Sequence, residues 1–86
     1  MMTVRMLYFA WVRERIGYGE EVVDVPAAIA DVGGLIDWLA TRSETHRAAF
    51  ADRARLRAAV DQAFVAMDAP IAGAREIAVF PPVTGG

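Results

Sequence analysis

The sequence of 86 residues contains no cysteine and no lysine. Without cysteine, the chain can form neither a disulfide bond nor a thiolate-based site. All nine basic residues are arginines. The chain therefore offers no lysine amine that could attack an activated acyl group on the protein itself.

Long apolar runs are also absent. Arg and Asp interrupt every apolar stretch, so none is suited to crossing a bilayer, and the first residues lack the apolar core of a secretion signal. We therefore expect a cytoplasmic protein that does not bind membranes. The net charge of −2 argues against general nucleic-acid binding, and the length allows a single core.

The first half of the chain predicts two strands and one helix. Residues 3–10 are rich in β-branched and aromatic side chains and predict a strand. A turn at residues 17–19 leads to a second strand at residues 21–25. Asp31 is a suitable helix N-cap, and the apolar residues that follow at helical spacing form one stripe: Val32, Leu35, Ile36 and Leu39.

The second half predicts a short helical turn within residues 46–53 and then three short strands, at residues 55–60, 64–67 and 76–80. A tight turn is expected at residues 61–62. This order predicts an α+β fold of the β-grasp, ubiquitin-like type, with a mixed sheet of four to five strands and one main helix crossing one face. The β-grasp domain would span residues 1–80, followed by an extended tail at residues 81–86.

Three phenylalanines are expected on the face of the sheet without the helix. Side chains alternate between the two faces along a strand. Phe9 shares its parity with Arg5, Phe64 with Gln62, and Phe80 with Glu76. An apolar patch formed by these rings is typical of a protein interface.

The remaining polar residues give weaker indications. His46 is the only histidine, and we expect it at the surface rather than on a metal. Arg53, Arg55 and Arg57 alternate along the expected strand, as a solvated basic edge or as a docking site for an acidic partner. No Ser/His/Asp set or pair of carboxylates stands out, so a free-standing catalyst is not expected.

The sequence ends in FPPVTGG, and we expect this tail to be the working part. Pro81 and Pro82 fix φ at about −65° and favour an extended arm, which Val83 and Thr84 continue. Gly85 and Gly86 carry no side chains, so a terminal carboxylate there could enter a narrow channel. Adenylation by ATP would make this carboxylate an electrophile for a sulfur or an amine nucleophile.

The tail, the preceding EIAVF, the segment LRAAVDQAFV and the opening VRMLYFAWVRERIG resemble the small subunits of molybdopterin synthase, which are β-grasp sulfur carriers. The resemblance covers nearly the whole chain. It implies that a ubiquitin-activating-type adenylyltransferase uses ATP to activate Gly86, that a sulfur-donor protein supplies the sulfur, and that the resulting thiocarboxylate delivers it to cyclic pyranopterin monophosphate. No cofactor would be bound directly.

The same resemblance implies a large-subunit partner, in a heterotetramer of two large and two small subunits. Phe9, Phe64 and Phe80 match the family's apolar contact surface, Arg13 matches a basic position beside it, and residues 81–86 would enter the large subunit. Other readings remain open: a sulfur carrier for thiamine or cysteine synthesis, a ubiquitin-like modifier conjugated through Gly86, or a binding module. The length and the Phe-Pro-Pro approach disfavour the thiamine pathway, and a binding module gives the Gly-Gly ending no purpose.

Overall fold

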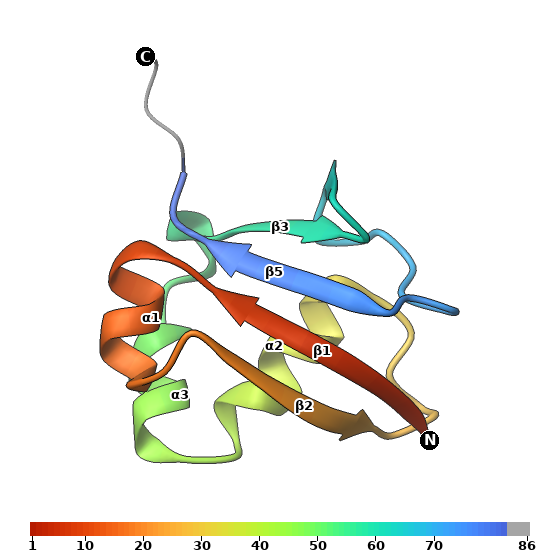
Figure 1. Ribbon diagram of the computed structural model, residues 1–86, viewed down its shortest axis with the longest axis horizontal. Coiled ribbons are helices and arrows are strands. Elements are labelled where there is room, and N and C mark those ends of the chain that lie inside the picture. The colour runs from red at the N-terminus through yellow and green to blue at the C-terminus, as the bar shows by residue number, and fades with distance from the viewer. Residues whose placement is uncertain (83–86) are drawn as a thin grey trace.

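The computed structural model describes residues 1–82, which form a five-stranded sheet with helices packed on one face (Figure 1). The strands are β1 (Met2–Tyr8), β2 (Glu20–Val25), β3 (Arg57–Val60), β4 (Ala63–Val65) and β5 (Glu76–Phe80). The helices are α1 (Ala10–Ile16), α2 (Val32–Ala40) and α3 (Glu44–Ala49), with a 3₁₀ turn, η1, at Arg53–Arg55.

The strand order is β2-β1-β5-β3-β4. β1 runs antiparallel to β2 and parallel to β5, whereas β3 is antiparallel to both β5 and β4. The first and last strands therefore lie beside each other inside the sheet, and the mixed sheet of an α+β fold is confirmed. Because β1 and β5 are parallel neighbours, their C-terminal ends lie at the same end of the sheet.

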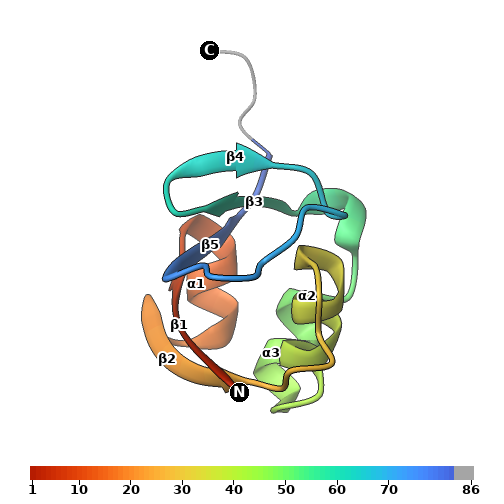
Figure 2. The same cartoon turned by 90° about the vertical axis from the view of Figure 1, so that its right-hand side faces the viewer.

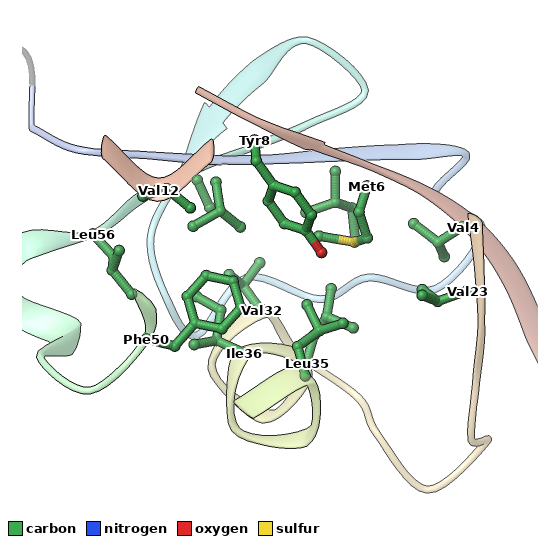
Figure 3. Packing of buried hydrophobic residues seen from close by; sticks show 14 of the residues in the cluster. Val4, Met6, Tyr8, Val12, Val23, Val32, Leu35, Ile36, Phe50 and Leu56 are labelled. Carbon is green, nitrogen blue, oxygen red and sulfur yellow. The ribbon is translucent and has the colours of Figure 1, made fainter. Parts of the chain in front are cut away.

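The core lies between the sheet and the helices (Figures 2 and 3). Alternate residues of β1 point inward, so Val4, Met6 and Tyr8 are buried while Arg5 between them is exposed. From the opposite side, α2 contributes the stripe that its sequence predicts, and Leu35 and Leu39 are fully buried. The Asp31 side chain caps this helix by accepting a hydrogen bond of 2.7 Å from the backbone N–H of Gly34.

The segment between the first two strands differs from expectation. Residues 3–10 predict a continuous strand, but β1 ends at Tyr8 and α1 follows before the antiparallel partner strand β2. Val12 and Ile16, one helical turn apart, are both buried. Gly17 ends the helix with φ of 105°, and its N–H donates to the carbonyl of Arg13 at 2.8 Å. Burial of this apolar pair and the glycine C-cap favour the helix over an extended strand.

The segment before β3 also departs from the expected strand. Residues 53–55 form the η1 turn, which Asp52 caps through a 3.1 Å hydrogen bond from the N–H of Ala54. The strand begins only at Arg57. The expected helical turn is α3, capped by Ser43, and the strand expected at residues 64–67 is the shorter β4. The fold therefore has α1, α3 and η1 in addition to the main helix α2 that the sequence predicts.

The tight turn between β3 and β4 is confirmed. Asp61 and Gln62 both adopt positive φ, 48° and 73°, which matches the right-handed twist of a two-residue hairpin. The Asp61 carboxylate also accepts hydrogen bonds from the backbone N–H groups of Arg75 and Glu76, at 3.0 and 2.9 Å. This side chain therefore ties the hairpin to the start of β5. Within residues 1–82, no helix has the length and apolar character to cross a membrane.

Candidate functional site

The candidate site is the outer face of the sheet, opposite the helices. One row of paired residues crosses four strands, because Leu7 pairs with Ala78, Ala78 with Ala59, and Ala59 with Phe64. The two alanines in the middle of this row are small, whereas larger apolar side chains stand at its ends. The row therefore forms the floor of a shallow depression.

This depression, which we call the apolar hollow, has a volume of about 520 Å³. Aromatic and proline side chains surround the alanine floor, and the polar side chains of Gln62 and Glu76 also line it. The apolar residues that line it are Leu7, Phe9, Ala10, Ala59, Phe64, Ala78, Phe80, Pro81 and Pro82. A concave, mostly apolar surface of this kind suits a protein partner or an apolar ligand.

All three phenylalanines lie on this face, as their strand parity predicts. Phe64 is 81% exposed and Phe9 is 49% exposed, while Phe80 is half-buried. The rings of Phe64 and Phe80 lie 5.6 Å apart at an interplanar angle of 50°, a favourable tilted arrangement. Exposing such rings to water is unfavourable in the free protein, and burial against a partner removes that cost.

Pro81 and Pro82 leave the sheet at the rim of the hollow. They directly follow β5 and are both half-buried, and both line the hollow. Their φ angles are restricted and they donate no backbone hydrogen bond, so β5 cannot extend through them as a paired strand. The predicted functional residues Val83, Thr84, Gly85 and Gly86 lie outside the described residues.

Arg13 does not join the phenylalanines in the hollow. It is exposed on α1, and its side chain packs over Gly19, where an added Cβ would lie 3.2 Å from the guanidinium Nε. Leu7, Ala59 and Ala78 line the hollow but are not among the site residues predicted from the sequence. The outward parity of Leu7 follows from Arg5, that of Ala78 from Glu76 and that of Ala59 from Arg57, but nothing local marks small alanines as the floor of a depression.

The expected row of basic side chains along a strand is also absent, because residues 53–55 belong to η1. Arg53 bonds to the Asp37 carboxylate and donates to the carbonyl of Gly33 at 3.1 Å. Arg57 donates to the carbonyls of Leu56 and Ala54, at 2.8 and 3.2 Å. Arg53 and Arg57 therefore bind different groups and do not form one continuous basic row along a strand.

A cluster of polar side chains lies on the helix-covered side of the sheet. His46, expected at the surface, is only 4% exposed. Its Nε2 lies 2.7 Å from a carboxylate oxygen of Glu21, and its Nδ1 lies 2.7 Å from the hydroxyl of Ser43. The hydroxyl of Tyr8 donates to the same oxygen of Glu21 at 2.7 Å, and that of Tyr18 lies 3.3 Å from the other.

This polar cluster is a structural element of the fold. Burial opposes ionisation of Glu21, but hydrogen bonds from Tyr8 and His46 outweigh it and lower the pKa of the Glu21 carboxyl. Burial and the bond to Glu21 raise the pKa of the Tyr8 hydroxyl. The cluster joins β1, β2 and α3. Among residues 1–82, no group of three or more His, Cys, Asp or Glu side chains is placed to hold a metal ion.

Comparison with known proteins gives a consistent result. Residues 6–86 match the model of the ThiS family. The chain is 39% identical to the molybdopterin synthase sulfur carrier subunit of Escherichia coli strain K12, covering 96% of this chain and 99% of that protein. It is 34% identical to the subunit of the same name from Mycosarcoma maydis, covering 98% of this chain and 94% of that protein.

A similar fold is found among solved structures. The crystal structure of SAMP1 from Haloferax volcanii superimposes with a TM-score of 0.72 at 26% sequence identity. The superposition covers 99% of this chain and 100% of that one.

Proposed function

Because the chain belongs to the ThiS family, we propose that it is a sulfur carrier that acts as the small subunit of a molybdopterin synthase. Two curated relatives that match nearly the whole chain, at 39% and 34% identity, carry this function in their names. The match includes residues 83–86, where the proposed chemistry takes place.

The observation that carries the proposal is the position of the apolar hollow. β5 forms part of the hollow, and Pro81 and Pro82 line its rim. A large subunit that covers Phe64 and Phe80 therefore also contacts the segment from which the tail begins. Docking on this face would fix the starting point of the tail relative to the partner's active site.

The proposed chemistry is carried by Gly86. An adenylyltransferase of the ubiquitin-activating type joins the Gly86 carboxylate to AMP and releases pyrophosphate from ATP. A persulfide sulfur on the sulfur-donor protein then displaces AMP, and a thiol cleaves the resulting acyl disulfide to leave a thiocarboxylate. The thiocarboxylate sulfur is transferred to cyclic pyranopterin monophosphate in the large subunit, and water restores the carboxylate.

The tail residues suit this route in their chemistry. Gly85 and Gly86 have no side chains to obstruct a narrow active-site channel, while Pro81 and Pro82 limit the conformations of the arm. The absence of lysine removes the side-chain amines that would compete for the acyl adenylate within the chain. Gly86 is therefore the reacting residue, and Phe9, Phe64 and Phe80 provide the docking surface.

The first test is the intact mass of the protein after incubation with ATP, its adenylyltransferase and a sulfur donor. Replacement of one oxygen by sulfur adds ~16 Da, and we expect this gain on the C-terminal peptide. Adding the large subunit and the pterin precursor should consume the added sulfur. A protein found instead linked through Gly86 to lysines of other proteins would be a modifier, and the proposal would be wrong.

A further inference from the structure

Two arginine side chains stack on a single tryptophan at one end of the molecule. Trp11 and Arg15 belong to α1, and Arg55 belongs to η1. The guanidinium carbon of Arg15 lies 5.6 Å from the centre of the Trp11 ring, and that of Arg55 lies 5.1 Å from it. We call these three residues the Trp11 cluster.

Neither guanidinium group is engaged by another side chain of the described residues. Within residues 1–82, neither Arg15 nor Arg55 forms an ion pair or a side-chain hydrogen bond, whereas Arg53 next to them pairs with Asp37. The in-plane N–H donors of a guanidinium group match a carboxylate in bidentate geometry. The two arginines are thus positioned in advance for carboxylate groups.

The two positive charges also repel each other. Because they contact the same ring, their separation cannot exceed the sum of their two distances from it. Both side chains are exposed, so water and salt weaken this repulsion, whereas both charges attract the same anionic group. The other tryptophan differs, since the Trp38 ring has only Arg42 over it among the described residues. An anionic group bound near Trp11 would interact favourably with both positive charges.

The cluster lies in the most basic part of the chain. Residues 10–16 and 52–57 contain five arginines but only two carboxylates, Glu14 and Asp52, in a protein with a net charge of −2. Asp52 already accepts a hydrogen bond from the backbone of η1. The remainder of the molecule is therefore acidic, and this asymmetry would orient an approaching charged partner.

The cluster adjoins the apolar hollow. Phe9 and Ala10 line the hollow, and Trp11 directly follows them at the start of α1. Figure 1 shows α1 at the same end of the sheet as the C-terminal end of β5. In register, Val79 of β5 pairs with Tyr8, and Phe80 pairs with Arg57, just beyond η1. A protein seated on the hollow can therefore reach the cluster.

We propose that Trp11, Arg15 and Arg55 form a docking site for an acidic segment of the large subunit that receives the tail. This inference rests on the proposed function and adds to it a charged contact beside the apolar one. Carboxylates of the partner would pair with the guanidinium groups of Arg15 and Arg55. A protein is favoured over nucleic acid as the ligand, because the acidic remainder of the chain would repel an extended polyanion.

The test is a double charge reversal, Arg15→Glu with Arg55→Glu. The control is Arg47→Glu with Arg75→Glu, which changes the net charge equally on α3 and in the turn before β5, both at exposed positions. Association with the large subunit is followed by stopped-flow fluorescence at about 0.05 M and about 0.5 M salt. We expect the cluster variant to associate about 10-fold more slowly at low salt, with a much smaller difference at high salt.

Other outcomes would overturn the inference. If the control slows as much as the cluster variant, only net charge matters; if neither slows, the cluster takes no part. Binding of duplex DNA by the unmodified protein, lost in the cluster variant, would identify a nucleic-acid site instead. Failure of the unmodified protein to bind the large subunit would refute the proposed function, whereas normal binding with an unaffected cluster variant would refute this inference alone.

Discussion

At the scale of single residues, Phe64 stands out because it is 81% exposed although it is a large apolar side chain in a strand. Its ring lies 5.6 Å from that of Phe80, and both rings line the hollow whose floor includes Ala59 and Ala78. An aromatic ring in this position contributes little to the stability of the free protein and a large apolar area to an interface.

Replacing Phe64 with alanine should therefore weaken binding of the large subunit without unfolding the domain. We expect a loss of about 2 kcal/mol, or roughly 30-fold in Kd, as for a central interface anchor, measured by isothermal titration calorimetry. Val22→Ala is the matched control, because Val22 is also exposed, at 67%, but lies on β2 outside the hollow. An unchanged Kd for the Phe64 variant would contradict the assignment of the docking face.

Gly86 gives a second prediction at this scale. A Gly86→Leu variant should fold normally and still bind the large subunit, yet lose sulfur transfer, because the added side chain would obstruct a channel that admits only glycine. Product formation in the reconstituted synthase measures this, with Thr84→Ser as a control that alters the tail without adding bulk. Normal product from the Gly86 variant would show that the tail does not act in this way.

At the scale of elements, α1 depends on its termination at Gly17. The φ of 105° there is a left-handed conformation that side chains rarely adopt, and an added Cβ would meet no atom within 4 Å. The cost of a substitution should therefore come from the backbone alone. This helix also carries Trp11 and connects β1 to its antiparallel neighbour β2.

We expect Gly17→Ala to lower the free energy of unfolding by about 1 kcal/mol, measured by urea denaturation. Gly17→Asn should cost less, because asparagine tolerates the left-handed region better than alanine. Equal losses in the two variants would indicate that the helix end rearranges rather than accepting the strain.

The polar cluster of Glu21, Tyr8 and His46 joins three elements and predicts how stability depends on pH. The pKa of Glu21 is lowered on folding, so its ionised form stabilises the fold above the ordinary value of 4.5, and this contribution disappears as pH falls through the lower folded value. The pKa of Tyr8 is raised, so its contribution is present below the ordinary value of 10.0 and is lost as pH rises toward the higher folded value.

Glu21→Gln should consequently reduce stability at neutral pH and make the acid loss of stability shallower. Urea denaturation between about pH 3 and about pH 7 tests this, with Glu14→Gln, an exposed glutamate of α1, as the control. Parallel stability curves for the Glu21 variant and the unmodified protein would show that its ionisation is not coupled to folding.

At the scale of the whole molecule, the helices cover one face of the sheet and leave the other available (Figure 2). The apolar hollow extends along β5 from Glu76 to Pro82, and the start of the tail and the basic Trp11 cluster lie toward the end where β1 and β5 terminate. The opposite layer holds the buried core and the polar cluster. This division allows a partner to cover the outer face without disturbing the packing of the domain.

We predict that the protein and the large subunit assemble as a complex of two large and two small chains, as the family resemblance implies. Light scattering after size-exclusion chromatography would give the mass of this complex. On dilution, the complex formed by the Phe64→Ala variant should dissociate at a higher protein concentration than the complex formed by the Val22→Ala control. A complex with one chain of each kind would contradict the predicted assembly.

Much of the fold could be predicted from the sequence, because its signals are local. Alternation in β1 and β5 separates Met6 and Val79 from the outward residues, and the spacing of Leu35 and Leu39 predicts the buried face of α2. The outward position of Phe64 follows from the same two-residue period. The family resemblance likewise rests on the sequence itself and agrees with the ThiS match.

Only the tertiary structure decided the contacts between residues far apart in the chain. His46 is buried because Glu21, 25 positions away, and Ser43 satisfy both nitrogens of its ring. The Trp11 cluster forms because η1 brings Arg55 beside α1, where Arg15 already lies near the Trp11 ring. Residues 10–16 form a helix although no side chain caps its start, since docking buries Val12 and Ile16. Local patterns determine which way a side chain faces, whereas its neighbours depend on how the whole chain closes around one core.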